Sequence, residues 1–300
     1  MAQMRSSSIH RFNADHGLGR WCRPIWYLFN WLGNSFLPNR QCSHLAIKRF
    51  FPDTSDAAWQ HINPKSSPSR ALSDLFWMQL PWARFEAELG QIRILDTGCG
   101  SGRYGIKLQE YSGSRVASYT GLDVRPHAGW RDVMKEHQFM KLLVADSASF
   151  ACLSPEHTNM FISQSAIEHF PEDLTYFRQV RDFVAQRSAP TIQVHLFPSA
   201  ACLRLYRFHG VRQYTPRTIS MIASLFQRSH CTLFELGGSE CNTLHVEYIR
   251  PVLLEGGTDR RELHPEEYAR RLRSAVQLDS DGDPGFYALV IHSKPKSRLF

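Results

Sequence analysis

The sequence lacks the features that mark membrane-spanning, secreted and zinc-binding chains. Its longest apolar run, residues 24–32, is about half the length that a transmembrane helix needs. No small-residue cleavage site follows this run, so we expect no secretory signal peptide. The seven cysteines form no C-x-x-C pair, which argues against a disulfide framework and a zinc site. We therefore expect a cytoplasmic protein with free thiols and no bound metal.

Acidic residues are almost absent from the first 50 residues. The chain of 300 residues has a net charge of +7, and residues 1–50 hold seven Lys and Arg residues against one acid, Asp15. The same segment combines these arginines with tryptophan, tyrosine and phenylalanine residues that cluster over residues 21–36. A turn-rich stretch, residues 63–70, follows. We therefore predict a basic, aromatic-rich helical extension over residues 1–69, followed by one domain over residues 70–300.

Four roles for the extension remain open. It can cover an active site as a helical cap, or contact an amphiphilic acceptor or an anionic membrane surface through residues 20–50. It can also stack on single-stranded nucleic acid. The basic residues are too few and too scattered to follow a phosphate backbone, which disfavours nucleic acid.

From residue 92 onward, short apolar runs alternate with helical stretches, as in a parallel α/β sheet. Helices are predicted over residues 173–186, from Thr215 as N-cap with Pro216 behind it, and over residues 264–278 inside a charged insertion at about 248–284. The predicted strands cover residues 92–98, 118–124, 141–146, 159–165, 191–197, 231–237 and 286–294.

The glycine-rich turn after the first of these strands fits two cofactor patterns. Gly100–Gly105 matches the dinucleotide pattern G-x-G-x-x-G, whereas Asp96–Gly102 matches an acid followed by G-x-G-x-G. In a nicotinamide fold the first glycine directly follows the strand, because the pyrophosphate lies at the helix N-terminus. Here the strand ends on Asp96, whose carboxylate would repel a pyrophosphate but attract an amino group. The turn therefore favours a ligand with a positive charge.

The next two strands also end in acids, Asp123 and Asp146. One strand-end aspartate alone often only caps the following helix. Three in succession, with Asp96 inside a glycine turn, suit a ligand that carries an ammonium group, a ribose and an adenine amine.

With these motifs the sequence resembles the class I S-adenosylmethionine-dependent methyltransferases, in their small-molecule branch, over about residues 85–295. The resemblance implies a doubly wound α/β sheet of seven strands in the order 3-2-1-4-5-7-6, with strand 7 antiparallel. It implies S-adenosyl-L-methionine as the cofactor. By the resemblance, the cofactor-binding residues are Asp96, Gly98, Gly100 and Gly102 at the methionine end, Asp123 at the ribose, Val124 near the adenine, Asp146 and Ser147 at the adenine amine, and Gln164 on the methionine side.

Residues 163–170, "SQSAIEHF", resemble the turn that follows the fourth strand in the small-molecule branch. They lack the "NPPY" or "DPPY" tetrapeptide with which methylases of exocyclic base nitrogens hold a flipped base. His169 is the best candidate for a general base, with Glu168 as its orienting partner, although both can be structural. His195 and His209 are secondary candidates, and a strand histidine with apolar neighbours, such as His195, is more often a core residue.

The resulting hypothesis is a methyltransferase that acts on a small-molecule acceptor. A sugar hydroxyl or a lipid-linked saccharide is the candidate acceptor, with oxygen favoured over nitrogen or carbon. The alternatives are an RNA or other macromolecular methyltransferase, a non-catalytic S-adenosylmethionine-binding regulatory module, and a nicotinamide-dependent oxidoreductase. The oligomeric state stays open.

Overall fold

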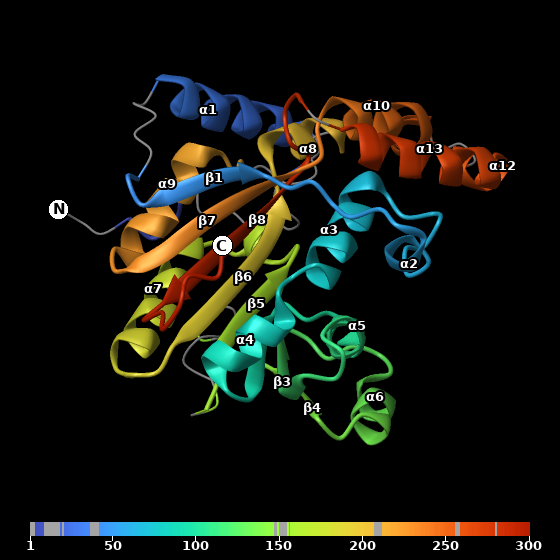
Figure 1. The fold of residues 1–300 in the computed structure, drawn as a ribbon. Helices are drawn as coiled ribbons and strands as arrows, with labels where there is room; N and C mark the ends of the chain where they lie inside the picture. The colour runs from blue at the N-terminus through green and yellow to red at the C-terminus, as the bar shows by residue number, and fades with distance from the viewer. Residues whose placement is uncertain are drawn as a thin grey trace.

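A computed structural model of the chain describes residues 4–8, 19, 21–36, 42–146, 149, 155, 157–206, 212–255, 259–279 and 281–300. Its centre is one eight-stranded sheet in the order β1-β7-β8-β6-β5-β2-β3-β4, with helices on both faces (Figure 1). Only β8 runs antiparallel to its neighbours, β6 and β7. The strands are β1 (Leu45–Arg49), β2 (Ile92–Thr97), β3 (Val116–Asp123), β4 (Met140–Val144), β5 (Met160–Gln164), β6 (Thr191–Pro198), β7 (Ser229–Leu236) and β8 (Phe286–Ser293).

The predicted α/β fold is confirmed, and so is the predicted order of seven strands, which corresponds to β4-β3-β2-β5-β6-β8-β7. An eighth strand that was not predicted, β1, pairs in parallel with β7 from Leu45 opposite Cys231 to Arg49 opposite Glu235. Only Leu45 is buried in this five-residue strand. A short, charged edge strand has little apolar alternation, because one side of it faces solvent, and the sequence pattern therefore gave no sign of it.

Helices of three kinds surround the sheet: those before β2, those between the parallel strands and those of the insertion before β8. The three helices predicted from the sequence correspond to α7, α9 and α13. At the start of α9 the Thr215 side chain accepts a hydrogen bond from the backbone N–H of Thr218, and Pro216 occupies the first turn, as predicted. The helices are α1 (Cys22–Phe36), α2 (Asp56–Trp59), α3 (Pro68–Met78), α4 (Trp82–Leu89), α5 (Arg103–Tyr111), α6 (Trp130–Glu136), η2 (Ile167–His169), α7 (Asp173–Ala185), α8 (Ala200–Leu205), α9 (Pro216–Ala223), η3 (Ser224–Phe226), α10 (Ser239–Tyr248), α11 (Arg250–Glu255), α12 (Arg260–Leu263) and α13 (Pro265–Leu278).

Successive residues of the central strands point to opposite faces of the sheet, and both faces are buried. In β2, Ile94 belongs to the core cluster beneath α3, whereas Leu95 belongs to the cluster beneath α7 and α9. Phe161 and Ile162 of β5 divide in the same way. This two-sided burial explains why the central strands are continuous apolar runs rather than alternating ones.

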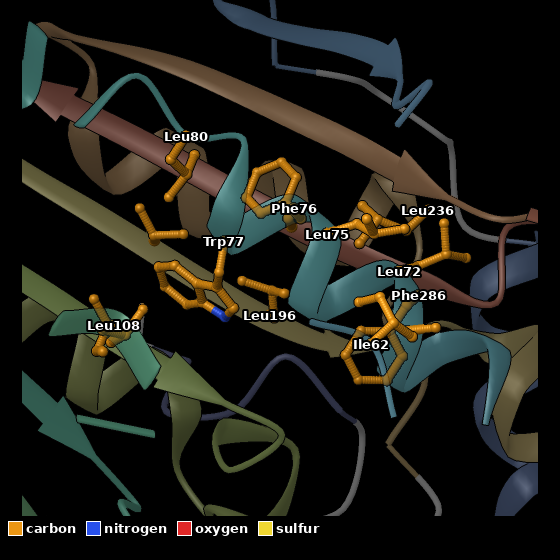
Figure 2. Close-up of a cluster of buried hydrophobic side chains, with 14 of the residues drawn as sticks. Ile62, Leu72, Leu75, Phe76, Trp77, Leu80, Leu108, Leu196, Leu236 and Phe286 are labelled. Carbon is orange, nitrogen blue, oxygen red and sulfur yellow. The ribbon is translucent and has the colours of Figure 1, made fainter. Parts of the chain in front are cut away.

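Helix α3 ties the segment before β2 to the sheet. Its Leu72, Leu75, Phe76 and Trp77 are buried, and Figure 2 shows them packed with Leu196, Leu236 and Phe286 of the strands. Figure 1 places α1, α8, α10 and α13 together at one end of the sheet. In the described ranges, no helix combines the length and the apolar character needed to cross a membrane.

Candidate functional site

The turn between β2 and α5 is built from glycines that no other residue replaces without strain. Gly98, Gly100 and Gly102 have φ angles of 80°, 55° and 77°, the left-handed region that residues with a Cβ rarely adopt. A Cβ on Gly98 would lie 2.3 Å from the Cβ of Ala166, whereas one on Gly100 would meet nothing within 4 Å. Gly98 thus lets β2 approach the turn after β5, and Gly100 leaves open space beside the turn.

Asp96 lies at the end of β2, fully buried beneath this turn. The Tyr119 hydroxyl donates to its Oδ2, and its Oδ1 has no hydrogen-bond partner among the described residues. Burial raises the pKa of Asp96 to about 7, opposed by the hydrogen bond from Tyr119 and assisted by the negative charge of Asp123. A buried carboxylate with one oxygen unbonded is costly, and a cationic ligand would relieve this cost.

Asp123 supports the same turn from the end of β3. Its Oδ2 accepts the backbone N–H of Gly100 at 2.8 Å, and its Oδ1 lies 3.6 Å from Nε2 of His127. Asp146 follows the neighbouring strand β4 and is exposed, and Val124 is 58% exposed. Ser147 lies outside the described residues. The structure therefore brings Asp96 and Asp123 to one turn, with Asp146 one strand further along the same edge.

A cavity of about 740 Å³ opens beside the turn. Asp96, Gly98 and Gly100 line it from the turn, and residues of α8 and the first residue of β8, Phe286, also line it. Asp123, Val124 and Asp146 do not line it. The predicted residues that do line it are Asp96, Gly98, Gly100, Gln164, Glu168 and His169.

The turn after β5 presents the predicted catalytic residues to this cavity. Glu168 is buried, the His169 ring is about one-third exposed, and 3.9 Å separates Nε2 of His169 from Oε1 of Glu168. Gln164, at the end of β5, accepts a hydrogen bond of 2.8 Å from the Trp77 indole at its Oε1. The cavity therefore holds a carboxylate, an imidazole and an amide in one place.

The secondary histidine candidates lie elsewhere. His195 is fully buried, is hydrogen-bonded to Ser163 Oγ at 3.0 Å, and packs edge-on against Tyr176 and Phe177. Burial lowers its pKa to about 3, so the ring stays neutral inside the core and has no access to the cavity. His209 is outside the described residues. In the part of the chain that the structure describes, no group of three or more His, Cys, Asp or Glu side chains could hold a metal ion.

The basic side chains along one side of the cavity were not predicted from the sequence. They are Arg70 of α3 and Arg103 and Lys107 of α5. Lys107 Nζ lies 2.8 Å from the buried Asp74, whose other oxygen accepts the Tyr104 hydroxyl. The Arg70 guanidinium lies 4.9 Å from the centre of the Tyr104 ring. An aspartate on the apolar face of α3 was the available signal, but its partners are about 30 residues away in the sequence.

Comparisons with known proteins found similarity among solved structures. No protein-family model matches the sequence, and no curated protein matches it. Among solved structures, the [4+2]-cyclase SpnF matches at 12% identity with a TM-score of 0.50, over 96% of this chain and 99% of the cyclase. The plantazolicin methyltransferase BamL, solved with S-adenosylhomocysteine and a triazolic desmethylPZN analog, matches at 13% identity and a TM-score of 0.44, over 76% of this chain and 86% of that chain. A SAM-dependent methyltransferase from Archaeoglobus fulgidus matches at 15% identity and a TM-score of 0.44, over 76% and 96%.

The strand order, with its single reversed strand, defines the Rossmann-like fold of the class I methyltransferases. The match with the cyclase spans nearly the whole of both chains and supports this fold alone. Because one fold serves many reactions, the activity has to be argued from the site.

Proposed function

We propose that this protein is an S-adenosylmethionine-dependent methyltransferase that acts on a small molecule. The observation that carries the proposal is Asp96, a buried carboxylate with one unbonded oxygen that lines a cavity, directly before a turn of three left-handed glycines. An ammonium group satisfies such a carboxylate, whereas a pyrophosphate is repelled by it. The site thus favours an aminoacyl cofactor over a nicotinamide dinucleotide.

The residues present fit this cofactor. Asp96 would hold its amino group, the Gly98–Gly102 turn would leave room for its methionine portion, and Asp123 would take its ribose. Asp146 and Ser147 remain the proposed contacts of the adenine amine, with Val124 beside it, and Gln164 faces the methionine side. When bound, the cofactor supplies an electrophilic methyl group on a sulfonium.

The side chains around the cavity would then align the acceptor and exclude water. Alignment alone can contribute about 7–11 kcal/mol in a displacement of this kind. His169 would remove a proton from an acceptor hydroxyl, and the Glu168 carboxylate oxygen, 3.9 Å from its Nε2, would favour the imidazolium. A hydroxyl acceptor needs such a base, since a neutral hydroxyl is a poor nucleophile.

For the acceptor, we propose a polar small molecule that carries hydroxyl groups, such as a saccharide. Ser69, Ser73 and Arg70 of α3 line the cavity, as does Lys107 of α5. These side chains suit hydroxyl and anionic groups rather than an apolar substrate. A lipid-linked saccharide is the variant of this acceptor that we favour if the protein meets a membrane.

Calorimetric titration of the full chain tests the cofactor assignment, with S-adenosylhomocysteine as the ligand. We expect the variant Asp123→Asn to lose about 1.5–3 kcal/mol of binding free energy, or roughly 10- to 150-fold in affinity, because hydrogen bonds to a charged acceptor are lost. Asp182→Asn is the matched control, since Asp182 is exposed on α7 and pairs there with Arg181.

Binding of NADH in place of S-adenosylhomocysteine would contradict the assignment, as would equal affinities of the two aspartate variants. A chain that binds S-adenosylhomocysteine but transfers no methyl group to any hydroxylated acceptor tested would favour the non-catalytic regulatory module. Methyl transfer to RNA alone would favour the macromolecular alternative.

A further inference from the structure

An ordinary surface helix turns its apolar face toward the core and its polar face toward solvent. In helix α1 the apolar face is exposed and the face with polar contacts is buried. Its outward face and the residue before it carry large apolar side chains, and the most exposed are Trp21 at 84% and Phe36 at 81%. Ile25, Leu28 and Phe29 are each more than half exposed between them. Side chains three or four positions apart share a helix face, so these five residues form one stripe, which we call the α1 stripe.

Polar contacts fix the inward face of α1 against α8 and α9. The Tyr27 hydroxyl donates to the carbonyl oxygen of Ala200, and the Gln213 amide donates to the carbonyl oxygen of Tyr27. Asn34 accepts from the Arg217 guanidinium at 3.0 Å and donates to Gln213 at 3.2 Å. The helix cannot roll to bury the α1 stripe without breaking these bonds, so the stripe faces outward in the folded protein.

A cationic hollow of about 350 Å³ runs along the edge of α1. Tyr27, Trp31 and Asn34 line it from the helix, and Arg204 and Arg217 line it from the other side. Its one acid is Asp283, which pairs with Arg204 at 3.0 Å. The hollow therefore contains two guanidinium groups and one carboxylate, which gives it a net positive charge beside the α1 stripe.

The dimensions of α1 distinguish the possible occupants of its stripe. Fifteen residues give a helix roughly 22 Å long and 10 Å wide, which is too short to cross a bilayer. A helix of this length can still lie in the plane of the bilayer surface, with its apolar side toward the acyl chains.

The composition of α1 matches that surface. The helix contains one arginine and no acid, and the first 50 residues hold seven basic residues against one acid. Tryptophan and phenylalanine settle at the boundary between headgroups and acyl chains, and arginine at their edge pairs with lipid phosphates.

We propose that α1 docks this protein on an anionic membrane surface, with the α1 stripe in the headgroup–acyl boundary and the Arg204–Arg217 hollow on lipid phosphates. The assignment rests on the helix and its neighbours, and it holds whether or not the cavity transfers a methyl group.

Vesicle co-sedimentation of the full chain tests the docking. We expect the chain to bind phosphatidylcholine vesicles that contain phosphatidylglycerol, and to bind pure phosphatidylcholine more weakly. The variant Ile25→Gln/Leu28→Gln/Phe29→Gln removes the middle of the α1 stripe, and we expect its partition to fall by more than about tenfold. All three positions are exposed, so circular dichroism should show an unchanged fold.

A matched variant controls for apolar surface in general. Phe51→Gln/Leu263→Gln/Leu278→Gln removes three side chains that are equally exposed but lie outside α1, and we expect it to bind vesicles like the unaltered chain. In a second arm, Arg204→Gln leaves the Arg217–Asn34 bond of the inward face intact. It should reduce the preference for phosphatidylglycerol while leaving the weaker binding to phosphatidylcholine.

Three results would overturn the docking: a full chain that binds no vesicles, equal losses in the two triple variants, or binding that is indifferent to phosphatidylglycerol. Sedimentation velocity adds a fourth. The full chain could be dimeric and the α1-stripe variant monomeric, with no vesicle binding by either. That result would assign the stripe to contact with a second copy of the chain instead.

Discussion

The protonation of Asp96 should make the stability of this protein depend on pH in a way that a single substitution removes. Burial raises the pKa of Asp96 from an ordinary value of 3.8 to about 7. Between these pH values the folded chain keeps a proton that the unfolded chain has released. The free energy of unfolding therefore falls as pH rises, by about 1.4 kcal/mol per pH unit, and levels off above pH 7. From pH 5 to pH 7 the ionisation of Asp96 should lower the free energy of unfolding by roughly 2 kcal/mol.

The variant Asp96→Asn has no group that titrates there, and its amide oxygen can still accept the Tyr119 hydroxyl. Urea unfolding of both chains at pH 5, 6 and 7 measures the difference between them, because other titrating groups contribute alike to both. We expect the free energy of unfolding of the variant, relative to that of the unaltered chain, to rise by roughly 2 kcal/mol from pH 5 to pH 7. A difference that stays constant over this range would refute the buried, ionisable carboxylate.

The same carboxylate links pH to the proposed cofactor. A positively charged amino group beside Asp96 favours its ionised form and so lowers its pKa. The affinity of the unaltered chain for S-adenosylhomocysteine should therefore rise from pH 6 to pH 8, and that of Asp96→Asn should be lower and flatter. Calorimetry at three pH values checks this. If the affinities of the two chains changed with pH in the same way, Asp96 would not contact the cofactor.

Three further predictions concern single positions. Gly98→Ala should destabilise the fold by about 2–4 kcal/mol in urea unfolding, since its Cβ would meet that of Ala166 at 2.3 Å, whereas Gly100→Ala, which has open space, should cost only about 1 kcal/mol; equal costs would contradict the turn geometry. His169→Ala should lower turnover by about 10²–10⁴-fold with little change in cofactor affinity if His169 is the base, and an unaltered rate would leave it a structural role. Arg212→Ala should cost about 3–5 kcal/mol in thermal or urea unfolding, because it leaves the buried Asp173, 2.8 Å from Arg212, without its ion pair; a loss below about 1 kcal/mol would count against that pair.

Local sequence patterns predicted the parts of the fold in which each residue's neighbours lie close along the chain. The apolar runs of β2 and β5 are buried on both faces, so their composition alone marks them as central strands. The glycine turn was predictable because a left-handed backbone selects glycine whatever the surroundings. Helix α9 was predictable because its cap is contained in residues 215–218.

Contacts between distant segments were beyond such patterns. The buried Asp74 of α3 binds Lys107 of α5, which lines the cavity, across about 30 residues of sequence. The sequence also does not reveal that Asp123 supports the glycine turn through Gly100 N–H, or that β1 joins the sheet at β7. In each case the decisive partner is set by the packing of elements that are separated along the chain.

The sequence by itself determined the class of fold, the strand order through the family resemblance, and the acid and glycines of the turn. Only the tertiary structure decided that Asp96 keeps an unbonded oxygen beside a cavity, that His195 lies in the core, and that α1 turns its apolar side outward. The spacing of apolar residues along the sequence indicates which residues share a face of a helix or strand. It does not report which of two faces the rest of the molecule covers, because that depends on polar contacts such as those of Tyr27 and Asn34 with residues 173 and 179 positions away.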